Sequence, residues 1–172
     1  AIGQSDNAFT PLQLATYCAT IANNGTRLKT HLVKQVTNYN RDQVISETEP
    51  EVVAQVDISE ENLKTVQEAM KGVTQSGGTA NSVFGDYGIT IAAKTGTAEN
   101  PGHSDNVTFI AYAPYDDPEI AVAVVLEYGS RGTYSMNVAK DIFDAYFYGK
   151  TVDENGNLVM PEETNSSSTA NE

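Results

Sequence analysis

An apolar run that ends in a polar tetrapeptide stands near the middle of this chain: Ile89-Thr90-Ile91-Ala92-Ala93-Lys94-Thr95-Gly96-Thr97. Its β-branched residues, and the turn residues on both sides of it, predict a β-strand. Side chains alternate between the two faces of a strand, so Thr95 shares a face with the apolar residue Ala93, and Lys94 and Gly96 lie on the other face. The strand therefore ends with a cation beside a residue that has no side chain.

The end of this strand predicts a binding site for a carboxylate and an extended peptide. Burying an unpaired ammonium is costly, so Lys94 should face a cleft or a partner. Gly96 lets the backbone of another molecule approach closely. The hydroxyl groups of Thr95 and Thr97 add hydrogen-bond donors. The alternative is a strand-end lysine beside a turn with no ligand, and the tripeptide alone does not decide between the two.

Composition bounds the class of protein. The chain has 172 residues, 40% hydrophobic and 19% charged, which is enough for one globular domain with a core. Its net charge of −13 argues against nucleic acid or anionic lipid as a partner. No apolar stretch has the length of a membrane span. Because the chain begins at Ala1 and not at Met, we expect it to be a piece of a longer protein.

The chain offers few residues for redox or metal chemistry. Its single cysteine, Cys18, excludes an internal disulfide and a cysteine-rich zinc site, and is expected to be a small core residue. His31 and His103 are far apart and lack metal-ligand spacing, so each is interpreted as a surface residue. We therefore expect no cofactor and no metal.

Two helices and an exposed hairpin are predicted before the central strand. The first helix is capped by Thr10, runs to about Ala22 and stops at the left-handed Gly25. It is apolar nearly all round, which is typical of an interior helix. Weak alternation over residues 26–56 predicts an exposed hairpin with its turn at 38–42, and a second helix follows Ser59.

Two more strands, at 106–113 and 120–126, follow the central one with short links, which predicts an antiparallel meander. A last helix is expected to be capped at or near Ser135 and to end at about Phe147. Residues 149–172 are polar and predict a flexible tail. The fold class is therefore α+β: an antiparallel sheet with three core strands, packed with helices.

Five short motifs, in this order, accompany that layout: Gly3-Gln4 with Thr10-Pro11-Leu12-Gln13-Leu14-Ala15; Ile21-Ala22-Asn23-Asn24-Gly25; Ala93-Lys94-Thr95-Gly96-Thr97-Ala98-Glu99; Phe109-Ile110-Ala111-Tyr112-Ala113-Pro114; and Ile120-Ala121-Val122-Ala123-Val124-Val125. Motifs and layout together resemble the C-terminal half of the transpeptidase domain of penicillin-binding proteins, over residues 1–148. The ending Thr97-Ala98-Glu99 is similar to that of the monofunctional, class B enzymes. The resemblance implies a penicillin-binding fold whose sheet gains further strands from a missing N-terminal half.

The resemblance implies acyl transfer on the D-Ala-D-Ala end of a peptidoglycan stem peptide, and binding of β-lactams that mimic this dipeptide. It assigns Lys94 to the substrate carboxylate and to the proton-transfer network. Thr95 and Thr97 offer hydroxyl groups to that carboxylate, and Gly96 leaves room for the ligand. The backbone N–H of Thr97 corresponds to an oxyanion-hole donor. Lys94 and Thr97 are thus the catalytic candidates, and residues 94–97 are the substrate-binding candidates.

The family's nucleophile is missing from this sequence. It lies in a Ser-x-x-Lys motif, and no serine here has a lysine three residues later. The spacing of that motif occurs in Thr26-Arg27-Leu28-Lys29, but with threonine in place of serine. The family's second motif, Ser-x-Asn, is matched by Ser5-Asp6-Asn7. We interpret this match as chance, because the string lies between Gly3-Gln4 and Thr10-Pro11, a stretch that in the family comes after Ser-x-Asn. We therefore expect the chain alone to be inactive and to need the missing N-terminal half as its partner.

The parent protein is expected at the outer face of the bacterial cytoplasmic membrane, anchored by a segment outside this chain. Two alternatives stay open. The chain could belong to a serine β-lactamase or a β-lactam sensor, which share the Lys-Thr-Gly strand. It could also be a non-catalytic module that binds peptide along an open strand edge.

Overall fold

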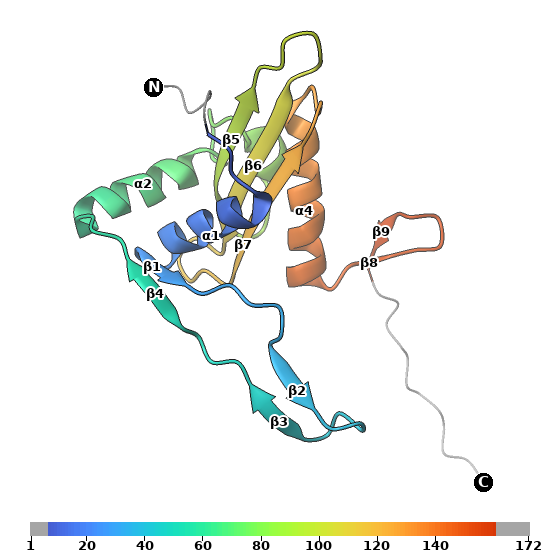
Figure 1. Cartoon of the computed structure of the whole chain (residues 1–172). Helices are drawn as coiled ribbons and strands as arrows, with labels where there is room; N and C mark the ends of the chain where they lie inside the picture. Colours follow the sequence, from blue (N-terminus) through green and yellow to red (C-terminus); the bar gives the residue numbers. More distant parts are fainter. Residues whose placement is uncertain (1–6, 161–172) are drawn as a thin grey trace.

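The computed structural model describes residues 7–160 and has a three-stranded antiparallel sheet with helices on both faces (Figure 1). The strands are β5 (Ala92–Ala98), β6 (Asn106–Ala113) and β7 (Ile120–Leu126), in the order β5-β6-β7. The predicted meander is confirmed. The central strand begins at Ala92, three residues later than the apolar run suggests: residues 88–89 form a bend, and residues 90–91 have no regular structure.

The register aligns the end of β5 with specific residues of its neighbours. Thr97 lies opposite Val107 of β6, and Val107 lies opposite Leu126 of β7. Ala92 and Ala93 are both fully buried but belong to different core clusters on opposite faces of the sheet. The predicted alternation of side chains is therefore confirmed at the start of the strand.

Helices α1 (Pro11–Ala22) and α2 (Glu60–Gly72) cover one face of the sheet. α1 begins with a capping box: the Thr10 hydroxyl accepts from the Gln13 N–H at 3.2 Å, and the Gln13 side chain accepts from the Thr10 N–H at 2.8 Å. Ser59 caps α2, and Gly25 adopts the left-handed conformation with φ of 82°. These sequence predictions are confirmed.

The side of α1 that faces away from the sheet is exposed to solvent, whereas an interior helix was predicted. Cys18 and Ile21 are buried against the sheet, but Leu12 and Tyr17 are 61% and 58% exposed. The prediction of an interior helix therefore holds only for the side of α1 that packs on β6 and β7; among residues 7–160, Leu12 and Tyr17 stay uncovered although α1 also contacts β1 and α2.

Helices α3 (Asn81–Phe84) and α4 (Gly132–Tyr148) pack on the other face of the sheet. The rings of Phe84, Phe109 and Phe143 meet in this core at centroid distances of 5.6 and 6.2 Å. α4 begins before the predicted cap: Arg131 is the N-cap residue, and Ser135 is buried inside the helix with its hydroxyl donating to the Gly132 carbonyl. α3 is a short helix between α2 and β5.

Residues 26–55 form an arm that extends away from the sheet (Figure 1). Two successive antiparallel ladders make up the arm: β1 (Thr26–Leu28) with β4 (Val52–Gln55), and β2 (Gln35–Thr37) with β3 (Val44–Glu47). Nearly all of its strand residues are exposed. The predicted exposed hairpin, with its turn at 38–42, is confirmed.

The polar end of the chain begins with a small hairpin. β8 (Thr151–Val152) pairs with β9 (Leu158–Val159) inside the segment 149–172 that the sequence assigns to a flexible tail. Residues 161–172 lie outside the described residues. The boundary at residue 148 stays a prediction.

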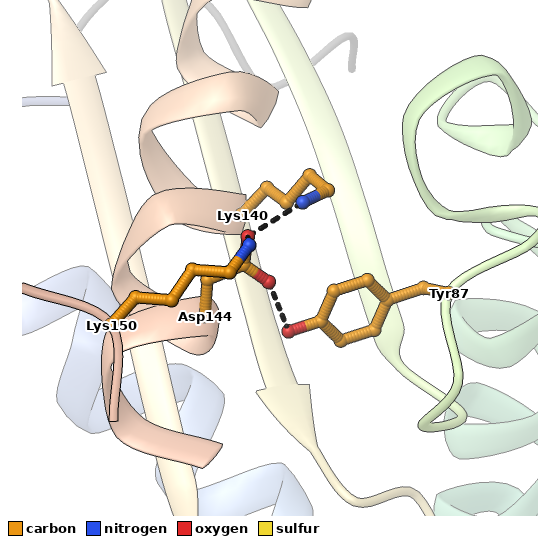
Figure 2. Close-up of polar contacts among 4 residues, drawn as sticks. All are labelled: Tyr87, Lys140, Asp144 and Lys150. Atoms are coloured by element: carbon orange, nitrogen blue, oxygen red, sulfur yellow. Dashed lines mark hydrogen bonds and ion pairs between the residues drawn. The ribbon is translucent and has the colours of Figure 1, made fainter. Parts of the chain in front are cut away.

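A buried carboxylate ties the entrance of β5 to α4 (Figure 2). The Tyr87 hydroxyl donates to Asp144 Oδ1 at 2.8 Å, and Lys140 and Lys150 donate to Oδ2 at 2.7 Å each. Asp144 is only 2% exposed. Burial by itself raises the pKa of Asp144, but the hydrogen bonds from Lys140, Lys150 and Tyr87 outweigh it and hold the pKa below its usual value.

We predict that Asp144→Asn lowers the free energy of unfolding by about 1–3 kcal/mol at pH 7, because two lysines lose the carboxylate they share. Both lysines are about one-third exposed, which keeps the loss below that of a fully buried pair. The stabilisation exists above the carboxyl's unfolded-state pKa and is lost as the pH falls through the lower folded-state pKa. The difference from wild type should therefore shrink below about pH 4.

Thermal unfolding of the 172-residue chain, followed by circular dichroism, measures this difference. Asp141→Asn is the matched control, because Asp141 lies exposed on the same helix. Equal melting temperatures for the two variants at pH 7 would contradict the role assigned to Asp144.

Candidate functional site

The predicted binding residues, Lys94 to Thr97, lie on a strand with one free edge. β5 pairs with β6 only, and no strand among residues 7–160 pairs with its other edge. Lys94 and Thr97 are exposed, and Thr95 and Gly96 are half-buried. The structure thus brings the four residues together at an accessible sheet edge (Figure 1).

Lys94 is a cation without a carboxylate partner in the described part of the chain. Its Nζ donates to the backbone carbonyl of Thr95. No Asp or Glu of residues 7–160 lies within ion-pair distance of it, although the chain carries a net charge of −13. Within residues 7–160, no carboxylate therefore competes with an anion that reaches the ammonium at this edge.

Thr95 has a hydroxyl partner that the sequence did not reveal. Its Oγ1 lies 3.1 Å from Oγ1 of Thr79, in the loop between α2 and α3. Thr79 and Thr95 lie 16 positions apart in the chain, so the sequence gives no local signal of their contact. Two neighbouring hydroxyls at the strand edge can donate and accept together.

Gly96 is not required by packing within the sheet. A Cβ at this position would meet only Thr108, at 3.5 Å from its Cβ and 3.8 Å from its carbonyl oxygen, which are ordinary van der Waals distances. Its backbone φ is also outside the left-handed region. The missing side chain therefore leaves open space at the site without being needed for the fold.

Two hydrogen bonds show which backbone groups the sheet itself uses. The Thr90 carbonyl accepts from the Tyr115 N–H at 2.8 Å, just beyond the end of β6, and the Ala113 carbonyl accepts from the Glu119 N–H at 2.9 Å on the β7 side. In an antiparallel ladder, the N–H and C=O of one residue point the same way and successive residues alternate. We infer that even-numbered residues of β5, from Ala92 on, bond to β6.

The same alternation turns the backbone groups of Ala93, Thr95 and Thr97 toward the free edge, because the β5–β6 register runs without a bulge. Two contacts agree with this parity. The Ile91 carbonyl accepts from the Thr74 hydroxyl at 2.7 Å, and the Thr95 carbonyl accepts from Lys94. The free edge thus presents a row of unpaired donors and acceptors, as edge strands do.

The Thr26-Arg27-Leu28-Lys29 string lies on the arm and not at this edge. Lys29, the end of the Thr26-Arg27-Leu28-Lys29 string, forms an ion pair with Glu51 at 2.7 Å on the exposed arm. Ser5 and Asp6 of the Ser5-Asp6-Asn7 string lie outside the described residues.

Residues 7–160 contain no cluster of three or more potential metal ligands from His, Cys, Asp and Glu. Within the same range, no helix has the length and hydrophobicity that crossing a membrane requires.

Comparison with known proteins agrees with the fold and the motif. The family described as penicillin binding protein transpeptidase domain matches residues 1–147. Penicillin-binding protein 2A of Bacillus subtilis is 37% identical over 166 residues, which cover 86% of this chain and 23% of the relative. Peptidoglycan D,D-transpeptidase PbpA of Mycolicibacterium smegmatis is 38% identical over 136 residues, covering 75% of this chain and 26% of the relative. The chain spans about a quarter of the length of these relatives.

Solved structures give the same result. Penicillin-binding protein A from M. tuberculosis, as an imipenem acyl-enzyme complex, superimposes with a TM-score of 0.71 at 31% identity, covering 85% of this chain and 32% of that one. Penicillin-binding protein 2B from Streptococcus pneumoniae gives a TM-score of 0.70 at 33% identity, and the match covers 80% of this chain and 24% of that one.

The predicted fold class and family are confirmed by the matches along the sequence and by the shared architecture. The chain belongs to the transpeptidase domain family of class B penicillin-binding proteins.

Proposed function

We propose that this chain supplies the substrate-strand side of a D,D-transpeptidase active site that cross-links peptidoglycan. The observation that carries the proposal is an edge of β5 with which no strand of residues 7–160 pairs. There, Lys94 has no carboxylate partner in that range, and the backbone groups of Thr95 and Thr97 are turned outward. A D-Ala-D-Ala end offers the matching chemistry: an extended peptide backbone and a terminal carboxylate.

Each residue of the edge has a distinct role in this proposal. The ammonium of Lys94 attracts the substrate carboxylate and lends its charge to proton transfer. The hydroxyls of Thr95 and Thr97 donate to the carboxylate, and Gly96 leaves space for the peptide. The N–H of Thr97 points to the free edge and serves as one oxyanion-hole donor, while the second donor belongs to the nucleophile itself.

The reaction itself requires a serine that this sequence does not supply in the family's Ser-x-x-Lys setting. In the proposal, a serine from outside this chain attacks the penultimate D-Ala carbonyl, and the terminal D-Ala leaves. An amine of a neighbouring strand then takes the acyl group from the serine. The lysine of the same Ser-x-x-Lys motif, which also lies outside this chain, acts as the base that activates the serine for this attack.

β-Lactam binding follows from the same chemistry. Solved relatives include imipenem and penicillin G acyl-enzyme complexes of penicillin-binding protein A. We propose that β-lactams acylate the complete site of this protein and that their carboxylate binds at Lys94. Because the substrate is the cell-wall peptide, the site works at the outer face of the cytoplasmic membrane, to which a segment outside this chain anchors the protein.

We predict that Lys94→Ala lowers the rate constant for acylation by penicillin G roughly 10- to 100-fold, because a charge-assisted hydrogen bond to a carboxylate contributes about 1.5–3 kcal/mol. The protein used is the chain extended by its natural upstream sequence, and the measurement is the time course of the mass increase. Lys29→Ala on the arm is the matched control and should acylate as wild type does.

The methyl ester of the same penicillin separates the carboxylate contact from other effects of the substitution. It lacks the negative charge, so Lys94→Ala should lose far less rate with the ester than with the free acid. An equal loss with both compounds, or no loss with the acid, would refute the assignment of Lys94 to the carboxylate.

We predict that Gly96→Ala keeps the melting temperature of wild type but slows acylation roughly tenfold, the equivalent of about 1.4 kcal/mol. The added methyl fits the sheet but enters the space reserved for the ligand. Gly72→Ala at the end of α2, where a Cβ meets no atom within 4 Å, is the control for adding a methyl elsewhere. Unchanged acylation of Gly96→Ala would show that the ligand does not approach this backbone.

A further inference from the structure

The loop between β7 and α4, residues 127–131, has a strained backbone. Tyr128 and Ser130 have φ of 55° and 62°, in the left-handed region, and Gly129 lies between them. A bulky residue such as tyrosine seldom adopts this conformation. Such strain persists only where the surroundings impose it, and it is frequent at functional sites.

The contacts that impose this conformation come from the start of β6 and the loop before it. The Tyr128 N–H donates to the Asn106 side-chain oxygen at 2.9 Å, and the Ser130 N–H donates to the Asp105 carbonyl at 3.0 Å. The ring of His103 lies 5.0 Å from the ring of Tyr128. The strained loop is therefore fastened to the β5–β6 hairpin, one residue beyond the ladder pair of Val107 and Thr97.

Gly129 is pressed against the sheet at this point. A Cβ on Gly129 would lie 2.5 Å from Cγ2 of Val107 and 2.9 Å from the Cβ of Leu126. Val107 is fully buried, so it has little room to yield. Val107 is also the direct ladder partner of Thr97, and Leu126 completes the row across the sheet.

We propose that Gly129 is a positioning residue for the reaction: through Val107 it fixes the place of the Thr97 backbone N–H. The inference rests on the proposed function, in which that N–H stabilises the oxyanion. A donor of this kind must lie within about 2.7–3.1 Å of the developing charge, so a displacement of a few tenths of an ångström weakens it. Gly129 acts on the transition state without touching the substrate.

The test compares two glycines at the same end of the sheet in the chain extended by its natural upstream sequence. Gly129→Ala forces Val107 or the loop to move. Gly132→Ala, three residues later at the start of α4, adds a Cβ that meets no atom within 4 Å. Stopped-flow acylation by penicillin G gives three quantities: the dissociation constant of the initial complex, the maximal acylation rate constant and the fraction of protein acylated.

We expect Gly129→Ala to lower the maximal acylation rate constant about tenfold or more, since losing a whole oxyanion donor costs 10²–10³ in rate. The dissociation constant and the acylated fraction should stay those of wild type, and Gly132→Ala should match wild type in all three. Val107→Ala in the Gly129→Ala background removes the shortest contact, that with the Val107 methyl groups, and should restore part of the rate constant.

Asn106→Ala is a milder test for the case that Gly129→Ala does not fold, because it frees the Tyr128 N–H without adding an atom. It should lower the same rate constant. A reduced acylated fraction with an unchanged rate constant, or no difference between Gly129→Ala and Gly132→Ala, would overturn the inference alone. A wild-type extended protein that is not acylated would overturn the proposed function and the inference with it.

Discussion

The edge of β5 with which no strand of residues 7–160 pairs is the constraint on which the rest of this structure depends. An edge strand exposes backbone donors and acceptors that invite another chain to pair, and proteins usually cover or interrupt such edges. Here the edge is left accessible beside Lys94, while the backbone of the same strand is fixed from the other side by an unbroken ladder with β6. The proposed function, in which the strand binds a peptide, needs an edge that is both open and rigid.

Rigidity comes from contacts at the entrance and at the end of the strand. At the entrance, the Thr74 hydroxyl binds the Ile91 carbonyl, and Tyr87 is tied to the buried carboxylate of Asp144. At the far end, the strained loop around Gly129 presses on Val107, the partner of Thr97. Every buried side-chain polar atom in residues 7–160 has a hydrogen-bond partner, so these contacts hold the strand without an unsatisfied group.

Patterns among neighbouring residues were enough to predict most helices and strands. Features that depend on contacts between residues far apart in the sequence could not be predicted. Thr10 marks the start of α1, and the apolar run before Lys94 marks β5, because a cap and an alternating pattern depend on neighbouring residues only. The loop before α4 is held by the Asp105 carbonyl, and Thr95 contacts Thr79; both are contacts between segments far apart in the sequence. For the same reason, the motif predicted Lys94 as a candidate site residue. The direction in which the backbone groups of Thr95 and Thr97 point could be inferred only from the pairing register of β5 with β6.

The central claim is that this chain carries one side of an acyl-transfer site whose nucleophile lies elsewhere in the protein. Intact mass after incubation with penicillin G, measured on the 172-residue chain and on the chain with its natural upstream sequence, tests it most directly. The account predicts an adduct of one penicillin on the extended protein and none on the chain alone. An adduct on the chain alone would contradict it and would make Ser5 the first residue to examine.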